Sequence, residues 1–276
     1  HTDDTLHQRL DDARPVRMIR QEDVLNSIES GARKCGPAWH PAKLDVDDPA
    51  CVLLTSGSTG RPKSIVNSQR NLLQRVAQSI NAAHINASDR FLTLASLSTI
   101  VGVRDTITAL LAGASVHFLD PQRAGAREIL NVIRTEGITI LFAFPALLRS
   151  VIAYAEGGAG DTLRLVRIGG DTTLWSDIDR LRAWLAPDSK IQSIYAATEA
   201  PMMQWFVDDC CRTDDVRIPI GYPLPGNRLA LIDEHGSNTP LGEIGELIVS
   251  SPYVALGLCG LFKTGDLVRQ RPDGLL

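Results

Sequence analysis

The chain has 276 residues and a formal net charge of −4, because 32 Asp and Glu outnumber 28 Lys and Arg. Its composition, 44% hydrophobic and 22% charged, is typical of a globular protein, and this length allows a large core without disulfides or a metal ion. The acidic balance argues against a general nucleic-acid binder and against a polybasic membrane-binding surface.

Short apolar runs alternate with segments of helical periodicity from residue 50 onward, after a polar and weakly patterned segment. Each run of about five apolar residues suits a buried strand, and the segments between them place apolar residues on one helical face. Gly137 can end a helix and Pro145 can begin one. Strands are expected at 50–54, 91–95, 115–119, 138–142, 163–168 and 191–195, and helices at 71–84, 106–112, 126–136, from 145 and around 175–185.

This alternation predicts an α/β fold with a largely parallel sheet flanked by helices. Beyond residue 218 the pattern changes, because two strand-like runs at 228–233 and 246–250 are separated by a turn-rich segment. We therefore expect an α/β core in residues 1–217 and a smaller strand-rich subdomain in residues 218–276.

A run of small and hydroxyl-bearing residues between two apolar segments is the most informative part of the sequence. Small residues let the backbone approach a phosphate, and successive amides can form an anion-binding nest. The run is not a P-loop, because Pro62 rather than glycine precedes Lys63. A flexible surface loop is the alternative, which the order of the whole segment disfavours. The run, which follows a predicted strand and precedes a predicted helix, comprises Thr55, Ser56, Gly57, Ser58, Thr59 and Gly60 and is followed by Lys63.

This segment resembles the phosphate-loop signature of the adenylate-forming superfamily. That superfamily contains acyl-CoA ligases, luciferases and the adenylation domains of nonribosomal peptide synthetases. Its members activate a carboxylic acid with ATP and Mg²⁺, release pyrophosphate and pass the acyl group to a thiol. The resemblance implies ATP and Mg²⁺ as cofactors, and phosphopantetheine or CoA as the thiol acceptor.

Two further segments follow in the order of that family. Gly169-Gly170-Asp171 comes after a predicted strand, where α/β sheets bind ligands, and the resemblance places this turn against adenine. The segment 195–199 is similar to the family's Tyr-Gly-x-Thr-Glu, with Ala196 in place of the usual glycine. The resemblance implies a ring beside adenine, a phosphate contact and a Mg²⁺ ligand, and a hard cation prefers such oxygen ligands. The segment comprises Tyr195, Ala196, Ala197, Thr198 and Glu199.

The last matching segment is Thr264-Gly265-Asp266. Alone it would favour a tight turn, but in this order it resembles the family's Thr-Gly-Asp signature. The resemblance implies that the Asp266 carboxylate accepts hydrogen bonds from the ribose hydroxyls. Lys63, Thr198 and Glu199 are the expected catalytic residues, and Glu199 is the expected metal ligand.

The resemblance also predicts the class of acid. Ile100 takes the place of the aspartate that pairs with the α-amine in amino-acid-activating domains, and an ammonium group there would be desolvated without a partner. We therefore expect a small acid without a free α-amine. If Arg104 or Arg167 points inward, the acid carries a second acidic or carbonyl group; the alternative is that both lie outside the pocket. The expected pocket residues are Ile100, Val101, Arg104, Ala143, Arg167, Gly169, Ile194, Met202 and Met203.

The N-terminal residues, the longest apolar stretch and the cysteines predict the compartment of the protein. The first 15 residues are polar rather than signal-like, and residues 138–148, the longest apolar stretch, are shorter than the about 20 that a membrane span needs. Five cysteines without a CxxC spacing indicate reduced thiols and no zinc site. We expect a cytoplasmic protein that binds neither nucleic acid nor membrane.

In the family, a small C-terminal domain supplies a further lysine beyond the Thr-Gly-Asp segment. We expect this chain to be a core without that domain and with an incomplete N-terminal portion, and to adenylate poorly by itself. Three alternatives stay open: a module of a larger synthetase with a carrier-protein domain as partner, a fragment of a free-standing acyl-CoA ligase, and a nucleotide-binding module without catalysis.

Overall fold

The computed structural model describes residues 43–56, 62–155, 158 and 160–276. The strands are β1 (Pro49–Ser56), β2 (Pro62–Ser68), β3 (Arg90–Thr93), β4 (Ser115–Phe118), β5 (Ile140–Ala143), β6 (Leu165–Gly169), β7 (Lys190–Ala196), β8 (Pro201–Phe206), β9 (Tyr222–Pro223), β10 (Arg228–Ile232), β11 (Ile244–Ser250) and β12 (Leu261–Arg269). The helices are α3 (Gln69–Ala83), α4 (Ile100–Leu111), α5 (Pro121–Thr135), α6 (Pro145–Ala153), α7 (Trp175–Trp184) and the short 3-10 helix η1 (Asp209–Cys211).

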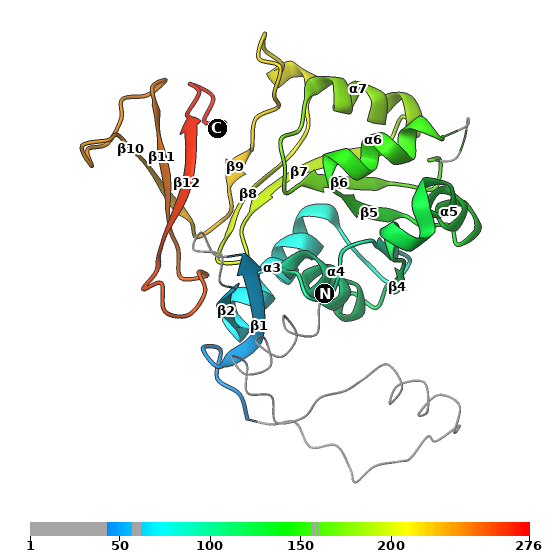
Figure 1. Cartoon of the computed structure of the whole chain (residues 1–276), viewed down its shortest axis with the longest axis horizontal. Coiled ribbons are helices and arrows are strands. Elements are labelled where there is room, and N and C mark those ends of the chain that lie inside the picture. The colour runs from blue at the N-terminus through cyan, green and yellow to red at the C-terminus, as the bar shows by residue number, and fades with distance from the viewer. Residues whose placement is uncertain (1–42, 57–61, 156–157, 159) are drawn as a thin grey trace.

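A seven-stranded sheet forms the centre of the molecule, in the order β4-β3-β5-β6-β7-β8-β9 (Figure 1). The strands β4, β3, β5, β6 and β7 run parallel, β8 is antiparallel to β7, and β9 is antiparallel to β8. The predicted α/β fold with a largely parallel sheet is therefore confirmed. A separate antiparallel sheet of β10, β11 and β12 follows, as the strand-like pattern beyond residue 218 predicts.

Helices cover both faces of the large sheet. Alternate residues of each strand point to opposite faces, so the apolar side chains of one strand are buried under helices on both sides. Phe91, Ile140 and Leu165 pack with α3 and α4 on one face. Their neighbours in the strands pack with α5, α6 and α7 on the other face, where Ile129 and Ile178 are fully buried. Figure 1 shows the central sheet between these two groups of helices. The result is a three-layer arrangement in which every central strand is covered on both sides.

Local signals place several helix ends correctly. Pro145 occupies the first turn of α6 as predicted, where its missing amide hydrogen costs no helical hydrogen bond. Gly137 follows α5 with a φ of 59°, in the left-handed region that favours glycine. In contrast, α4 begins at Ile100, six residues before the expected start. Thr99 caps it by accepting a hydrogen bond from the amide of Gly102, and the β-branched residues and glycine of this turn conceal the helical pattern.

The strand predicted at 50–54 exists but is not a buried strand of the central sheet. Among the residues that the structure describes, it pairs only with β2, in a two-stranded antiparallel sheet. One of its faces therefore stays open, and the side chain of Val52 is 47% exposed. The predicted neighbour of the phosphate loop is also corrected, because β2 and not a helix follows the loop.

The boundary between residues 217 and 218 stays a prediction. The short strand β9, which lies beyond it, pairs with β8 at the edge of the large sheet. In the described part of the chain, the structure contains no helix with the length and apolar character of a membrane span.

Candidate functional site

A cleft of about 460 Å³ opens at the carboxyl ends of β6 and β7. Parallel α/β sheets bind ligands at this edge, because the loops there leave the strands in different directions. The cleft brings together predicted residues from three separate segments of the sequence. It is lined by Gly169, Gly170, Asp171, Thr172, Thr173, Ser193, Ile194, Tyr195, Ala196, Arg217, Ile218, Pro219, Ile220, Asp266, Leu267 and Val268.

The two glycines of the turn after β6 are required by close packing. A Cβ on Gly169 would lie 2.0 Å from the carbonyl oxygen of Ile194 in the adjacent strand. Gly170 has a φ of 77°, and a Cβ there would lie 2.5 Å from the ring of Phe144. Any larger residue would push the turn away from β7 and deform the floor of the cleft.

Tyr195 and Asp266 meet across the cleft, although 71 positions separate them in the sequence. The Tyr195 hydroxyl donates a hydrogen bond to Oδ2 of Asp266. Burial and this hydrogen bond raise the pKa of Tyr195 well above its ordinary value. The phenol therefore stays protonated, and the second carboxylate oxygen of Asp266 is left to accept a hydrogen bond from a ligand.

An irregularity in β12 holds Asp266 in this position. Ile248 pairs with Lys263 while Glu246 pairs with Leu267, so β12 has extra residues relative to β11. Gly265 lies within this bulge with a φ of 76°. The bulge reorients the strand locally, and the Thr-Gly-Asp segment is therefore a bulged strand rather than an isolated tight turn.

Hydrogen bonds from Arg75 of α3 hold the loop after β7 in place. This side chain is only 4% exposed, and its Nη2 donates to the carbonyl oxygens of Ala197 and Thr198 at 3.0 and 3.1 Å. The amide of Ala255 donates to the carbonyl oxygen of Glu199 at 2.7 Å. Sequence reasoning missed Arg75, because it belongs to no motif; a lone arginine on the apolar face of a predicted helix was the only available signal.

Only the two ends of the phosphate-loop segment belong to the described residues. Thr55 of β1 and Lys63 of β2 are directly paired, and the Thr55 hydroxyl donates to the carbonyl oxygen of Lys63 at 3.4 Å. Lys63 is exposed. The predicted ligands Gly57, Ser58, Thr59 and Gly60 lie outside the described residues, as does the Ser56 side chain. The amide of Leu256 donates a hydrogen bond to the carbonyl oxygen of Val66 in β2. The adjacent residue, Ala255, is the one that donates to Glu199, so this short segment connects β2 with the loop after β7.

The residues at the cleft are compatible with ATP and Mg²⁺. The described residues contain no group of three or more His, Cys, Asp or Glu side chains that could hold a metal ion by themselves. Mg²⁺ commonly binds through one or two carboxylates together with substrate phosphates. Glu199 does not line the cleft itself, but it is half-buried and follows Ala196 of the lining by three residues. A single carboxylate of this kind suits a metal that arrives with the nucleotide.

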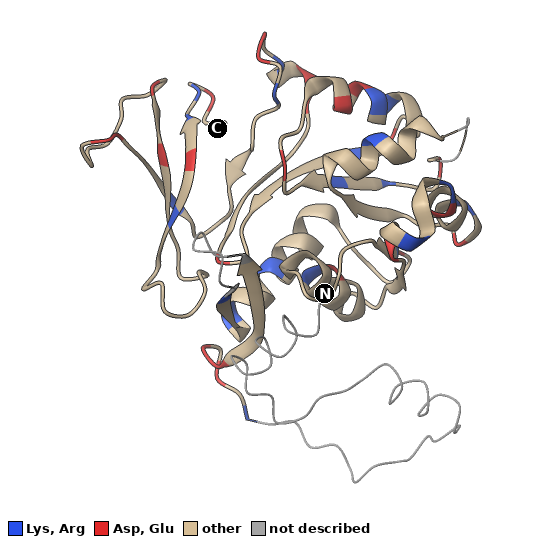
Figure 2. Cartoon of the chain, in the orientation of Figure 1, with Lys and Arg blue, Asp and Glu red and all other residues tan. Residues whose placement is uncertain are grey.

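A second, much smaller cavity of about 30 Å³ lies on the α3 and α4 face of the sheet. Arg75, Arg104 and Arg167 line it, and Figure 2 shows basic positions on the neighbouring helices α3 and α4. The cavity shares Ile194 and Ala196 with the nucleotide cleft, so the two hollows are neighbours at this part of β7.

Hydrogen bonds hold the arginines of this cavity in place. Arg167, 1% exposed, donates to Gln192, to Ser79 and to Asp105 at 3.0, 3.0 and 3.3 Å. Arg104 donates from Nε to the same Asp105 oxygen at 2.9 Å and lies over the ring of Phe142, 5.3 Å from its centroid. Both arginines are therefore buried beside the cavity rather than turned to the solvent.

Burial and repulsion from Arg104 lower the pKa of both Arg75 and Arg167 to about 9. Removing a guanidinium from water disfavours its charged form, and a like charge nearby adds to that effect. Burial is the larger cause for both arginines, and repulsion from Arg104 is the second.

Five of the nine predicted acid-binding residues line one or both of these hollows. Arg104, Arg167, Ile194 and Met203 line the small cavity, and Gly169 and Ile194 line the nucleotide cleft. The other four, which line neither hollow, are Ile100 at the start of α4, Val101, Ala143 in the core of the large sheet and Met202 in the core beside the three-stranded sheet.

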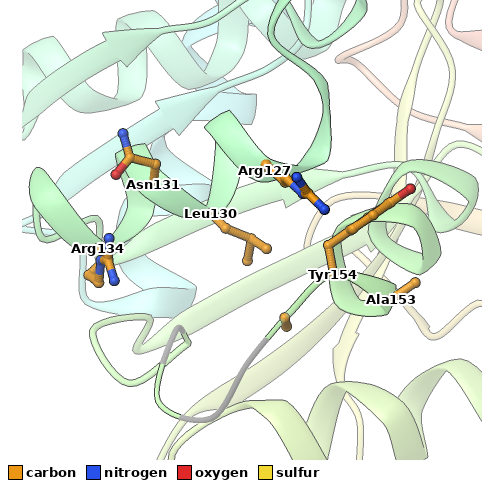
Figure 3. A pocket seen from close by; sticks show the side chains of 7 residues that line it. Arg127, Leu130, Asn131, Arg134, Ala153 and Tyr154 are labelled. Carbon is orange, nitrogen blue, oxygen red and sulfur yellow. The ribbon is translucent and has the colours of Figure 1, made fainter.

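Another hollow, of about 440 Å³, lies between α5 and the end of α6 (Figure 3). The guanidinium of Arg127 lies 5.6 Å from the ring centroid of Tyr154 there. None of the predicted site residues lines this hollow. Its size therefore does not connect it with the chemistry that the sequence motifs describe.

Comparisons with known proteins identify the family to which the chain is similar. The family model of AMP-binding enzymes matches residues 1–259. The chain is 31% identical over 282 residues to phenyloxazoline synthase MbtB of Mycolicibacterium paratuberculosis, covering 95% of this chain and 24% of that protein. It is 33% identical over 241 residues to L-proline--[L-prolyl-carrier protein] ligase of Pseudomonas fluorescens, covering 84% of this chain and 48% of that protein. The chain thus spans half or less of the length of these relatives.

Solved structures share the fold. The N-terminal subdomain of Klebsiella oxytoca NpsA, in complex with 3-hydroxybenzoyl-AMSN, superimposes with a TM-score of 0.81 and 21% identity. That match covers 100% of this chain and 77% of the other. O-succinylbenzoate coenzyme A synthetase of Bacillus subtilis, in complex with ATP and magnesium ion, gives a TM-score of 0.75 at 19% identity, covering 93% and 56% of the two chains.

Proposed function

Because the chain belongs to the AMP-binding enzyme family, we propose that it activates a carboxylic acid with ATP. A carboxylate oxygen attacks the α-phosphorus of ATP, the new P–O bond joins the acid to AMP, and the bond to the β-phosphate breaks so that pyrophosphate leaves. The convergence of the glycine turn, Tyr195 and Asp266 in one cleft is the observation that carries this proposal.

The described residues suggest a role for each part of the nucleotide. The ring of Tyr195 flanks adenine, and the free oxygen of Asp266 accepts from the ribose hydroxyls. Lys63 and Thr198 contact the phosphates, and Glu199 contributes an oxygen to Mg²⁺, which when bound offsets the negative charge of the phosphates. The remaining proposed nucleotide ligands are Thr55, Ser56, Gly57, Ser58, Thr59, Gly60, Gly169, Gly170, Asp171, Ala196 and Ala197.

The acid that we propose lacks a free α-amine. Ile100, at the first turn of α4, offers no carboxylate to an ammonium group. The three arginines beside β7 add an independent argument, because their charge repels a cation that enters from the cleft. Aryl, fatty, keto and hydroxy acids meet both conditions.

We propose that a thiol receives the acyl group. Its sulfur attacks the acyl carbon of the adenylate, the bond to the phosphate oxygen of AMP breaks, and the thiol proton passes to the solvent. A relative that is named as a carrier-protein ligase favours phosphopantetheine on a carrier protein, and CoA is the alternative. Mass spectrometry of a carrier protein after incubation with ATP and the acid distinguishes the two by its mass increase.

ATP–pyrophosphate exchange in the natural polypeptide that carries this sequence tests the proposed activation. The panel pairs α-amino acids with the hydroxy and keto acids of the same carbon skeleton. We expect exchange with at least one acid that lacks an amine, and a loss of about tenfold or more in Glu199→Ala, because the metal loses a charged ligand. Preferred exchange with an ordinary α-amino acid would contradict the substrate proposal.

A nucleotide-binding module without catalysis gives a different result in the same assay. It would bind ATP but exchange no pyrophosphate with any acid of the panel. Isothermal titration calorimetry with ATP therefore accompanies the exchange assay and separates loss of binding from loss of chemistry.

A further inference from the structure

The small cavity beside β7 contains an imbalance of buried charge. Three guanidinium groups line it, and the side chains of Arg75, Arg104 and Arg167 are 4%, 6% and 1% exposed. Asp105, 3% exposed, accepts from two of them through a single oxygen. Buried charges are normally paired, because removing an ion from water is costly.

Arg75 does not receive a buried carboxylate of its own. It donates to the amide oxygen of Asn71 and to the backbone carbonyls of Ala197 and Thr198, which are neutral acceptors. The carboxylate that acts on it is that of Glu199, which is only half-buried. Two of the three positive charges around the cavity are therefore not balanced by a buried anion.

The cavity has room and donors for a small anionic group. A buried water needs roughly 10 to 15 Å³ of such space, so about 30 Å³ accommodates the oxygens of one carboxylate. Nη2 of Arg104 lies 2.8 Å from Asp105 but makes no hydrogen bond of adequate geometry with any described residue. This nitrogen is buried and is free to donate to an additional acceptor.

The position of the cavity connects it to the reaction. Ile194 and Ala196 line both the cavity and the nucleotide cleft. An acid that extends past this part of β7 has one end beside the nucleotide and the other beside the arginines. The cavity is thus placed to hold the end of the substrate that does not react.

We propose that the arginine cavity binds a second carboxylate, and that the acid activated by this chain is a dicarboxylic acid. This inference rests on the proposed activation of a carboxylic acid. One carboxylate reacts with ATP in the cleft, and the other receives hydrogen bonds from the buried guanidinium groups. A planar pair of oxygens suits the arrangement of guanidinium donors. An uncharged tail in the same place would leave Nη2 of Arg104 without an acceptor.

The test compares dicarboxylic acids with monocarboxylic acids of the same skeleton, in ATP–pyrophosphate exchange by the natural polypeptide. Succinate, glutarate and adipate are paired with butanoate, pentanoate and hexanoate, and isophthalate is paired with benzoate. For at least one pair we expect kcat/KM to be about tenfold or more higher for the dicarboxylate, because a hydrogen bond to a charged group is lost in its partner. Equal or better exchange with the monocarboxylates throughout would overturn the inference while leaving the proposed activation intact.

Variants then identify the residues responsible. Arg104→Met retains much of the side-chain volume, and Asp105 keeps its contact with Arg167. We expect this variant to lose the dicarboxylate preference. Arg123→Met removes an equivalent guanidinium from an exposed pair with Asp120 and is the matched control, which should keep the preference. A preference that survives Arg104→Met would also overturn the inference.

Failure of the underlying activity has a separate signature. If no acid of either kind supports exchange, the proposed function fails and the inference fails with it. Exchange that depends on the chain length of monocarboxylates alone contradicts only the inference. Because the wild-type panel decides between these outcomes, the test stands even if Arg104→Met does not fold.

Discussion

The two hollows beside β7 differ in how far their polar and charged side chains are exposed to solvent. On one side, the nucleotide cleft is open, and its polar groups such as Asp171 and Asp266 are exposed. On the other side, the arginine cavity is small, and the arginines that line it are almost completely buried. A cleft of solvated groups can be altered with little effect on folding, whereas a buried charge affects stability as soon as one partner is removed. Binding and stability should therefore respond separately to substitutions on the two sides.

The largest effect is expected from Arg167→Met on the cavity side. The substitution leaves the buried oxygens of Gln192 and Ser79 without their donor, at roughly 1 to 3 kcal/mol each. We expect the free energy of unfolding, measured by urea denaturation, to fall by about 3 kcal/mol. Arg70→Met, which removes an exposed pair with Asp47, is the control and should leave it nearly unchanged. Equal stability of both variants would mean that relief of repulsion from Arg104 offsets the lost hydrogen bonds.

Asp266→Ala tests the opposite side and should affect binding rather than folding. Loss of a carboxylate acceptor for the ribose should weaken ATP binding by roughly tenfold or more, as measured by isothermal titration calorimetry. The urea midpoint should change little, because Asp266 is exposed. Asp214→Ala, an exposed carboxylate outside the cleft, is the control. Unchanged affinity in Asp266→Ala would show that the ribose assignment is wrong.

Tyr195→Phe should give the smallest effect, because it keeps the ring and removes only the hydroxyl that contacts Asp266. The raised pKa of Tyr195 means that the phenol ionises at higher pH in the folded chain than in the unfolded chain. Its contribution to stability is therefore complete below about pH 10 and decreases as the pH rises further.

Ultraviolet titration of the phenols provides the measurement for Tyr195. The chain has four tyrosines, and one should ionise later than the others while the protein is folded. Tyr195→Phe should remove that late transition and lower ATP affinity only a few-fold. If the late transition persists in this variant, it belongs to another tyrosine and the assignment to Tyr195 is wrong.

Much of the fold follows from local patterns. The alternation of apolar runs with helical periodicity predicted the α/β core, and Pro145 and Gly137 predicted helix ends that the structure contains. The pattern did not reveal that β1 pairs only with β2, because an apolar run indicates a strand and not its partner. It also placed the start of α4 late, since Gly102 and its β-branched neighbours have low helix propensity.

The sequence by itself determined the order of the motifs, because glycine turns and short polar segments are local features. That order led to the family and to seven of the sixteen residues that line the nucleotide cleft. Only the tertiary structure brought Tyr195 to Asp266 across 71 positions and placed arginines from α3, α4 and β6 around one cavity. The physical reason is that periodicity encodes which face a side chain occupies, while packing of distant elements decides which charges share that face.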